Sequence, residues 1–402
     1  MAILAAALAA CGGGGGGGAV TGSGLPTGAT VNAQAASTST FTAEAAVPIY
    51  PATSGQQALL SVGALAEGGH AVAWLEPDGA GAQARVRSQR FDAQGAREGD
   101  ALSVSVDALL GAPAAMPLPN GGLVVATPVA SPSSVDKPWI TRSAIRVQRL
   151  AADGTAVSDT DVGAVLQNRI GAATMRYVEA PALIRWDDGG FLVGWSLVDD
   201  DGTHKTPQFW VQRFDASGRA AGAASMAAQG EIDSPFALTA TPNGGWLLAT
   251  FHRLQGRTVL RYHPFQGASA PVLPAGAPGV AEGSTLVPLA GGGSVLLQPV
   301  QGYGALQLFA ADGQPRGQPG GLPQAVAGGA ALRDGGFVAF LDTGSGLAAQ
   351  RFDAIARPMG GATPIAAQRN LQAAPMTWGA LAIAWTATGA AGDTDAMTQR
   401  LR

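Results

Sequence analysis

The sequence Asp-Gly-Gly-Phe-Leu-Val-Gly-Trp at residues 188–195, followed by Val-Gln-Arg-Phe-Asp-Ala-Ser-Gly at 211–218, decides the fold because partial copies of both recur along the chain. The aromatic or leucine position of the second motif recurs, in steps of 43 to 64 residues, at Phe91, Leu150, Phe214, Tyr262, Phe309, Phe352 and Leu401. A glycine pair precedes each copy and ends at Gly69, Gly122, Gly190, Gly245, Gly293 and Gly336, with Ala380 in the seventh place. Seven units of this length are typical of a β-propeller.

The third unit shows how each unit is built. Short apolar runs at residues 182–186, 191–195 and 208–214, and a weaker one near 221–227, are separated by turns rich in Asp and Gly. Such turns join antiparallel strands, because their residues tolerate positive φ. We therefore expect an all-β protein: a seven-bladed β-propeller of four-stranded antiparallel blades.

The two ends of the repeat array complement each other. The last unit stops after its third strand, at residues 397–401, whereas the run at residues 40–47 precedes the first unit and has no other assignment. Pairing of the two would remove two exposed sheet edges. We expect residues 38–48 to pair with residues 395–402, so that an N-terminal strand completes the last blade, closes the ring and makes 38–402 one propeller domain.

The first residues suggest export. Residues 1–10 are apolar but too short to span a bilayer, and they end in Leu-Ala-Ala-Cys at 8–11, which resembles the lipobox of bacterial lipoproteins. The resemblance implies a signal peptide at 1–10, lipidation of Cys11, and a lipid-anchored protein of the bacterial envelope, in the outer membrane or at the cell surface. Seven glycines at 12–18 open a flexible tether, which together with the lipidated cysteine covers 11–37.

Composition excludes one class of partner. The net charge is −4, only 13% of residues are charged, and the lysines are Lys137 and Lys205, with the arginines dispersed along the chain. No basic stripe could neutralise a phosphate backbone, so nucleic acid is not an expected partner. No cofactor-binding motif is present, and no cofactor is expected.

Two recurring side chains are interpreted as structural. The arginine before the marker aromatic occurs at 90, 149, 213, 261, 351 and 400 and would face different directions around a ring. It cannot build one site, so we expect it to hydrogen-bond turn carbonyls or carboxylates such as Asp188 and Asp334. The tryptophans at 74, 195 and 385 share one position of the repeat and are expected to pack between blades.

Insertions concentrate on one face, over the first three units. The span from glycine pair to marker aromatic is 22, 28 and 24 residues there, against 16 to 21 in the other units, and the link at 156–181 is the longest of its kind. Long, non-repeating loops on a rigid scaffold are where binding usually resides. The candidate binding residues on this face are Asp136, Lys137, Trp139, Arg142, Arg176, Tyr177, Glu179, Asp199, Asp200, Asp201, His204 and Lys205.

Specific chemistry is harder to assign. Asp-Asp-Asp-Gly at 199–202 could offer oxygen ligands to a hard cation, but it lacks the spaced pattern of a calcium loop, and a solvated acidic turn is the alternative. Arg176, Tyr177 and Glu179 could mimic a sialidase-like pocket, yet the sialidase Asp-box is absent. No two histidines have a metal-ligand spacing. We therefore assign no metal site and no catalytic residue.

The unit resembles a repeat of exported bacterial proteins, Asp-Gly-Gly-Phe-Val-Val-x-Trp followed by Tyr-x-Gln-Arg-Phe-Asp-x-x-Gly. Residues 188–195 with 211–218 match it closely, residues 334–339 with 349–354 nearly as well, and the fifth unit departs with Leu308 in place of the arginine. The resemblance implies a surface or periplasmic propeller and carries over no catalytic residue.

These observations favour a non-catalytic binding or scaffold module anchored in the bacterial envelope, with an envelope protein or a surface glycan as partner and membrane contact through the lipid anchor only. The alternative is a glycan-active enzyme, a hydrolase or lyase, with carboxylates at the mouth of the propeller channel.

Overall fold

The computed structural model describes residues 40–50, 56–77, 83–106, 111–132, 140–168, 175–186, 188–203, 205–229, 232–240, 245–252, 257–263, 284–289, 293–300, 302–310, 314–368, 371–376, 379–388 and 394–402. The predicted signal peptide, Cys11 and the tether lie outside these residues. In this part of the chain no helix is long and apolar enough to cross a bilayer.

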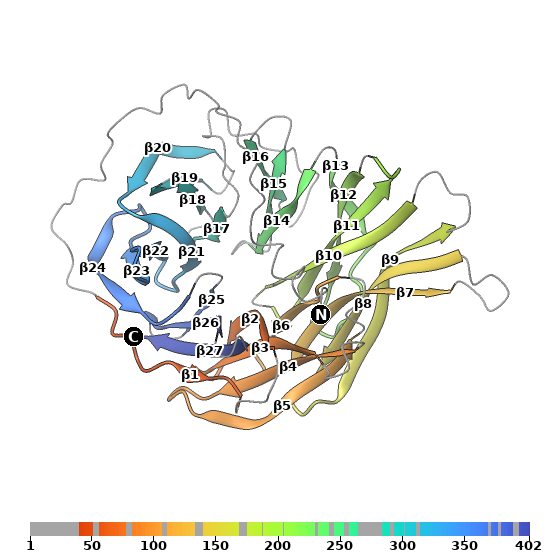
Figure 1. Cartoon of the computed structure of the whole chain (residues 1–402), viewed down its shortest axis with the longest axis horizontal. Coiled ribbons are helices and arrows are strands. Elements are labelled where there is room, and N and C mark those ends of the chain that lie inside the picture. Colours follow the sequence, from red (N-terminus) through yellow and green to blue (C-terminus); the bar gives the residue numbers. More distant parts are fainter. Residues whose placement is uncertain are drawn as a thin grey trace.

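The described residues form seven antiparallel sheets that follow one another along the chain (Figure 1). Sheet 1 holds β2 (Ala58–Ala64), β3 (His70–Pro77), β4 (Ala84–Phe91) and β5 (Arg97–Val106). Sheet 2 holds β6 (Ala114–Pro117), β7 (Leu123–Pro132), β8 (Ile140–Leu150) and β9 (Ala156–Asn168). Sheet 3 holds β10 (Met175–Arg185), β11 (Phe191–Asp200), β12 (Lys205–Phe214) and β13 (Ser225–Gln229), and sheet 4 holds β14 (Ile232–Ala240), β15 (Trp246–His252) and β16 (Arg257–His263).

The remaining sheets come from the last third of the chain and from its N-terminal side. Sheet 5 holds β17 (Thr285–Pro288), β18 (Ser294–Val300), β19 (Tyr303–Phe309) and β20 (Pro315–Leu322). Sheet 6 holds β21 (Ala325–Ala331), β22 (Phe337–Asp342), β23 (Leu347–Phe352) and β24 (Pro358–Ile365). Sheet 7 holds β25 (Gln372–Pro375), β26 (Leu381–Thr388), β27 (Thr394–Leu401) and, beside β27, β1 (Val47–Pro48).

The spacing between glycine pair and marker aromatic has a direct cause. A Cβ at Gly336 would overlap the carbonyl oxygen of Phe352, and one at Gly69 would overlap that of Phe91. The close approach brings the start of the second strand against the end of the third. Phe337 then stacks on Phe352, with ring centroids 4.9 Å apart.

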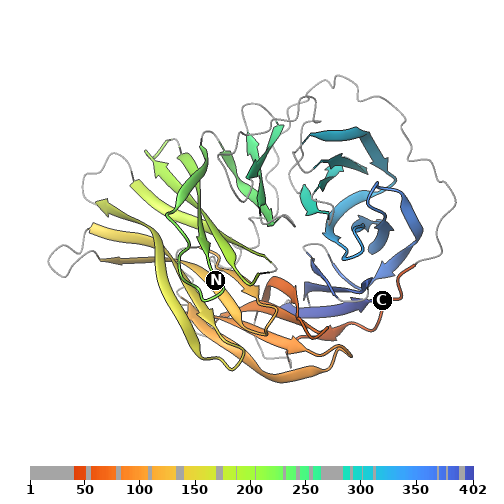
Figure 2. The ribbon, with the colours of Figure 1, turned by 180° about the vertical axis from the view of Figure 1, so that it is seen from behind.

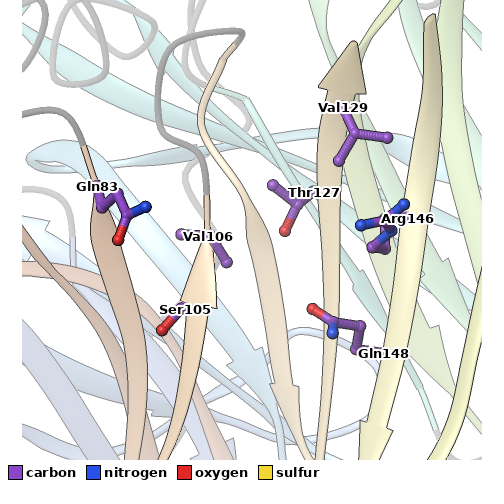
Figure 3. Close-up of a pocket in the computed structure, with 7 residues that line it drawn as sticks. All are labelled: Gln83, Ser105, Val106, Thr127, Val129, Arg146 and Gln148. Carbon is purple, nitrogen blue, oxygen red and sulfur yellow. The ribbon is translucent and has the colours of Figure 1, made fainter. Parts of the chain in front are cut away.

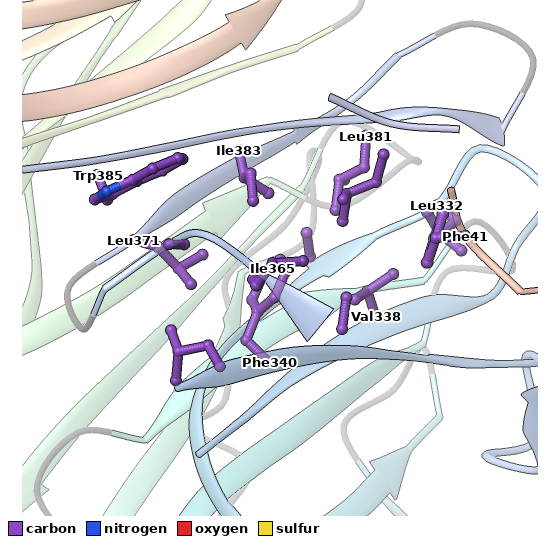
Figure 4. Close-up of a cluster of buried hydrophobic side chains, with 14 residues drawn as sticks. Phe41, Leu332, Val338, Phe340, Ile365, Leu371, Leu381, Ile383 and Trp385 are labelled. Carbon is purple, nitrogen blue, oxygen red and sulfur yellow. The ribbon is translucent and has the colours of Figure 1, made fainter. Parts of the chain in front are cut away.

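The sheets are joined face to face by buried apolar side chains. Trp74, Trp195 and Trp385 are at most 2% exposed, as predicted for packing between sheets. Trp385 of β26, for example, belongs to the same buried cluster as Val338 and Phe340 of sheet 6 (Figure 4). The cores are therefore shared between neighbouring sheets.

The first strands of the sheets meet near the middle of the molecule. β2 contacts β6, β6 contacts β10, β10 contacts β14, and the series continues through β17, β21 and β25, which contacts β2 again. Arg185 at the end of β10 donates to the carbonyl oxygens of Ala64 (3.2 Å) and Pro117 (3.5 Å), on β2 and β6. The view from behind shows the same succession of sheets (Figure 2).

The two ends of the described chain lie side by side, as predicted for residues 38–48 and 395–402. Val47 lies opposite Thr398, Ala43 opposite Leu401, and the Thr42 amide donates to the Arg402 carbonyl oxygen. The pairing is less regular than expected, because β1 is only two residues long and the rest of this segment pairs through isolated bonds.

The glutamine before the recurring arginine position binds the third strand to the outer one, a role that was not predicted from the sequence. In sheet 6, Gln350 Nε2 donates to the carbonyl oxygens of Met359 and Gly360, each at 3.3 Å, at a bulge in the strand pairing. In sheet 7 the described strand beside β27 is β1, from the other end of the chain, and Gln399 Nε2 donates to the carbonyl oxygen of Glu44 at 2.6 Å.

Three of the six recurring arginines make the predicted bonds to carboxylates or turn carbonyl oxygens. Arg351 pairs with Asp334, and Arg213 approaches Asp188 at 3.5 Å. Arg400 is 6% exposed, binds Glu44 with its Nε at 2.7 Å, and also donates to turn carbonyl oxygens at Ala93 and Gln94 of sheet 1.

One prediction about loops was wrong. Much of the long link at residues 156–181 is strand, because β9 extends to Asn168 along β8 and β10 begins at Met175, ahead of the predicted start at residue 182. β13 likewise begins at Ser225, later than expected. Sheets 2 and 3 are therefore extended on the face where the candidate residues gather.

Candidate functional site

The structure places eight of the twelve candidate residues. Asp136, Lys137, Trp139 and His204 lie outside the described residues. Seven of the eight belong to one end of sheet 3, and Arg142 lies on β8 of sheet 2. We call the seven residues the sheet 3 cluster: Arg176, Tyr177, Glu179, Asp199, Asp200, Asp201 and Lys205.

Strand register brings the cluster together. Arg176 of β10 lies opposite Asp199 of β11, and Asp200 lies opposite Lys205 of β12. Arg176 binds Asp199 through two hydrogen bonds of 2.6 and 2.8 Å, the geometry in which a guanidinium and a carboxylate are most specific. The Arg176 side chain is half exposed, so the pair fixes geometry more than it stabilises the fold.

Lys205 lies over an aromatic ring. Its Nζ is 5.7 Å from the centroid of the Tyr177 ring and 3.8 Å from Asp200 Oδ2. A hydrogen bond with Tyr177 raises the pKa of Lys205, and Glu179 and Asp200 act in the same direction. The ammonium therefore stays charged at neutral pH, next to a ring face that can attract it.

Glu179 differs from the other carboxylates of the cluster. Burial raises its pKa, Lys205 opposes the shift, and Asp200 adds to it. It lies at a bulge in the pairing of β10 with β11, just before Ala180, whose φ of 50° is unusual for a residue with a side chain. The cluster thus holds a carboxyl group that takes up a proton more readily than a solvated glutamate.

Two of the three aspartates, Asp200 and Asp201, shape a turn. Asp200 Oδ1 accepts from the Gly202 amide at 2.9 Å, and Asp201 Oδ1 accepts from the amide and hydroxyl of Thr203 at 2.8 and 2.7 Å. Such bonds are the usual role of aspartate in turns. Within the described residues no group of three or more His, Cys, Asp or Glu side chains is placed to hold a metal ion.

Arg142 takes part in a different network. Its Nη1 lies 2.5 Å from Asp161 Oδ2 on β9, and Arg146 Nε lies 3.0 Å from Asp161 Oδ1. Although burial opposes it, the pKa of Asp161 is lowered by its hydrogen bonds to Arg142 and Arg146. The candidate set therefore divides between the sheet 3 cluster and this second network on sheet 2.

Comparisons with known proteins give no family. No family model matches the chain, and no curated protein matches it.

Similar solved structures include a prolyl endopeptidase, with a TM-score of 0.48, 14% identity, 85% coverage of this chain and 45% of that one. The β-propeller domain of the Trilobed protease from Pyrococcus furiosus has a TM-score of 0.47, 10% identity and coverages of 86% and 94%. A protein of unknown function from Dyadobacter fermentans has a TM-score of 0.48, 13% identity and coverages of 90% and 99%. The chain spans less than half of the endopeptidase. Each of these three TM-scores is below 0.5, and the fold is defined by the pairing of the strands themselves.

Proposed function

We propose that the seven sheets are the blades of a seven-bladed β-propeller, with the segment that contains β1 as the outer strand of the last blade. Two observations support this closure. The first strands contact one another in order, from β2 round to β25 and back. Glu44 and Gln399, 355 positions apart, make the bond that joins third and outer strands elsewhere.

The function that fits this scaffold best is that of a non-catalytic binding or scaffold module of the bacterial envelope, anchored by a lipid on Cys11. Its partner would be an envelope protein or a surface glycan, with the membrane contacted through the anchor alone and no nucleic acid bound. The observation that carries the binding proposal is the sheet 3 cluster. A tyrosine ring, a charged lysine and several carboxylates are held in fixed positions at the exposed end of one sheet. Aromatic and charged side chains on a rigid support are typical of binding surfaces.

The test is capture of partners from envelope extracts by the lipidated protein. Tyr177→Ala and Lys205→Ala should each reduce capture, because each removes one contact of the sheet 3 cluster, and Trp139→Ala, a candidate from the sequence alone, should reduce it too. Tyr303→Ala is the matched control, since Tyr303 is 38% exposed on β19 of sheet 5. Undiminished capture by the first three variants, or an equal loss with Tyr303→Ala, would rule out this face.

The second candidate is a glycan hydrolase or lyase, and Glu179 is the observation that favours it. Glycoside hydrolysis uses a pair of carboxyl groups, one of which has a raised pKa, and Glu179, whose pKa is raised by burial and by Asp200, offers such a group beside a second one. The assay is release of reducing ends from envelope glycans, with Glu179→Gln expected to abolish it. Activity that survives Glu179→Gln, or no release by the native protein, excludes catalysis at this site.

A further inference from the structure

The two ends of the described chain meet at a junction that no covalent bond crosses (Figure 1). On one side lie residues 42–50, residues 56 and 57, and sheet 1, and on the other side lie β25, β26 and β27 of sheet 7. We call this junction the seam. It is held only by contacts between the two sides, so its strength depends on how well those contacts are made.

Three polar atoms are buried at the seam without a hydrogen-bond partner among the described residues: Gln57 Nε2, His70 Nδ1 and Trp74 Nε1. Each of these side chains is at most 1% exposed. Gln57 Oε1 accepts from the Ala396 amide at 3.1 Å, and Trp74 packs in one cluster with Ala384 and Ala396 of sheet 7. A buried polar atom without a partner weakens the contact that buries it, because water would bind it. Separation of the two sides would let water reach all three atoms.

His70 is the titratable member of this group. Its Nε2 lies 3.2 Å from the Thr398 hydroxyl oxygen of β27, and that hydroxyl donates to the Ile383 carbonyl oxygen at 2.9 Å. Nε2 therefore carries the hydrogen atom and donates across the seam, which leaves Nδ1 with a lone pair. The ring also stacks on Phe91, with centroids 4.8 Å apart. A second proton would go to Nδ1, where the described residues offer it no acceptor.

Charged groups on both sides of the seam act on His70. Burial and Arg400 of β27 lower its pKa to about 4, whereas Asp92, in the turn after β4, acts in the opposite direction. Arg400 is held by Glu44, which accepts from its Nε at 2.7 Å. An imidazolium would thus lie buried near a fixed positive charge, whereas a histidine in water binds its proton near pH 6.5. Between these two pH values, proton uptake favours a state in which the seam is open.

The junction on the other side of sheet 1 offers a comparison. A pocket of about 120 Å³ opens there between sheets 1 and 2, with Thr127, Arg146 and Gln148 in its lining (Figure 3). Arg146 lies 3.0 Å from Asp161, and Gln148 donates to Asp159 at 3.1 Å. Burial opposes the charge of Asp161, but its hydrogen bonds to arginines lower its pKa. Asp161 therefore keeps its charge at pH 4.5, and we expect no response to mild acid at this junction.

We propose that the seam is an acid-sensitive junction: a proton bound by His70 separates β27 from residues 42–49 and from sheet 1, while sheets 2 to 6 stay folded. The open state frees the N-terminal segment and hydrates the three buried polar atoms. This inference concerns how the domain opens, and it does not depend on binding at the sheet 3 cluster.

The experiment is amide hydrogen exchange of the full-length protein between pH 4.5 and 7.5, followed by mass spectrometry and corrected for the pH dependence of the chemical exchange step. The reporter peptide covers residues 42–49, in which the amides of Glu44 and Ile49 donate to the Arg400 and Ala396 carbonyl oxygens at 2.9 Å. Its opening equilibrium should rise roughly 70-fold from pH 7.5 to 4.5, as expected when the pKa of His70 is about 4 in the closed state and 6.5 in the open state. Amides of β8, beside the pocket, and of β22 in sheet 6 should keep their protection.

His70→Phe should reduce this rise to less than about threefold, because phenylalanine does not bind a proton. His70→Gln is the second variant, since its amide can donate to Thr398 as the imidazole does and it does not titrate. His252→Phe is the matched control, because this histidine ends β15 in sheet 4, and it should show the full rise.

Three results would overturn the proposal. The first is exchange at residues 42–49 that does not rise in acid, and the second is a rise that persists in His70→Phe and His70→Gln. The third is an equal rise in β8 and β22, which would mean that the whole domain unfolds. Partner capture through Tyr177 and Lys205 is measured separately at neutral pH, so failure here is distinguishable from failure of the proposed function.

Discussion

Sheets 6 and 7 have the same internal design but different connectivity. Sheet 6 is one continuous stretch, in which Gln350 bonds to carbonyl oxygens nine and ten residues further on. In sheet 7 the equivalent Gln399 bonds to the Glu44 carbonyl oxygen at the other end of the chain. The glutamine of the third strand therefore makes the same kind of bond to the segment beside it, whichever part of the chain supplies that segment.

The recurring arginine shows the same contrast. Arg351 pairs with Asp334 of its own sheet, whereas Arg400 binds Glu44 and two turn carbonyl oxygens of sheet 1. Arg400 is also the more buried, with 7% of its side chain exposed against 19% for Arg351. Sheet 7 thus relies on side-chain bonds where sheet 6 relies on chain continuity.

Removal of residues 395–402 should have the largest effect on folding, because it removes the strand that joins the two ends of the chain in sheet 7. This deletion takes away β27, so that β26 loses a partner strand and β1 loses the strand that lies beside it in the described part of the chain. We expect the cooperative thermal transition, followed by circular dichroism, to be lost. Arg402→Ala is the control, because that side chain is 55% exposed, and it should melt like the native protein. An unchanged melting curve for the deletion would contradict the pairing.

Core truncation should affect both sheets, and sheet 7 at least as strongly. Trp385 of sheet 7 and Leu341 of sheet 6 occupy the same position of the repeat, and each is 2% exposed. We expect Trp385→Ala to lower the free energy of unfolding by about 3–5 kcal/mol and Leu341→Ala by about 2–5 kcal/mol. Urea unfolding measures both. Ile355→Ala, at a side chain of sheet 6 that is 56% exposed, should change it by less than about 0.5 kcal/mol.

The junction of sheet 7 with sheet 1 should depend on pH through His70. Its Nε2 lies 3.2 Å from Thr398 Oγ1, and because that hydroxyl donates to the Ile383 carbonyl oxygen, His70 is the donor. Burial, aided by Arg400 and opposed by Asp92, lowers the pKa of His70 to about 4. The unfolded chain therefore binds a proton between pH 6.5 and 4 that the folded protein does not bind.

Stability contributed by His70 should be complete above pH 6.5 and fall by about 3 kcal/mol as the pH drops to 4. His70→Phe should abolish this part of the pH dependence, because phenylalanine does not titrate. The variant should fold, because Phe191 and Phe337 occupy the same position of the repeat and stack on Phe214 and Phe352. The measurement is urea unfolding of both proteins from pH 4 to 7.5. Parallel stability curves for the two would show that His70 does not contribute.

The glutamine bonds should give a smaller but more local effect. Gln399→Ala removes a buried donor and Gln350→Ala a half-buried one, with an expected loss of about 1–3 kcal/mol each. Only Gln399→Ala should accelerate amide hydrogen exchange at residues 42–49, because only Gln399 binds that segment. Equal exchange in the two variants would mean that the backbone bonds of the segment are sufficient without Gln399.

Most of the fold features that could be predicted from the sequence come from the repeated motifs. Glycine pairs and marker aromatics recur because each touches the other across two strands, so their spacing reports a contact, as Gly336 and Phe352 illustrate. The packing of Trp385 between sheets and the pairing of Arg351 with Asp334 could be predicted in the same way, because both residues recur at one position of the repeat. The recurring Gln, which precedes the arginine at 89, 148, 212, 350 and 399 and precedes Leu308 at 307, was an available signal for the bond to the outer strand.

Features that do not repeat could not be predicted from the sequence. The grouping of Arg176, Tyr177 and Lys205 depends on strand register, which charged residues in a variable segment do not reveal. The separation of Arg142 from this group follows from Asp161, whose strand had been expected to be a loop. Thr127 lines a pocket between two sheets, and nothing in its local sequence distinguishes it from a core threonine.

The backbone hydrogen bonds between Thr42 and Arg402 hold both ends of the described chain side by side, so the proposed ring lacks only a covalent link at this point. A short linker across that junction, with a new opening cut at the exposed turn around Ile355, would give a permuted chain whose last sheet is continuous and whose sixth is assembled from both ends. In such a chain Gln350 would bind a segment from the opposite end of the chain, and Gln399 would bind a segment joined directly to its own sheet, although neither side chain is changed.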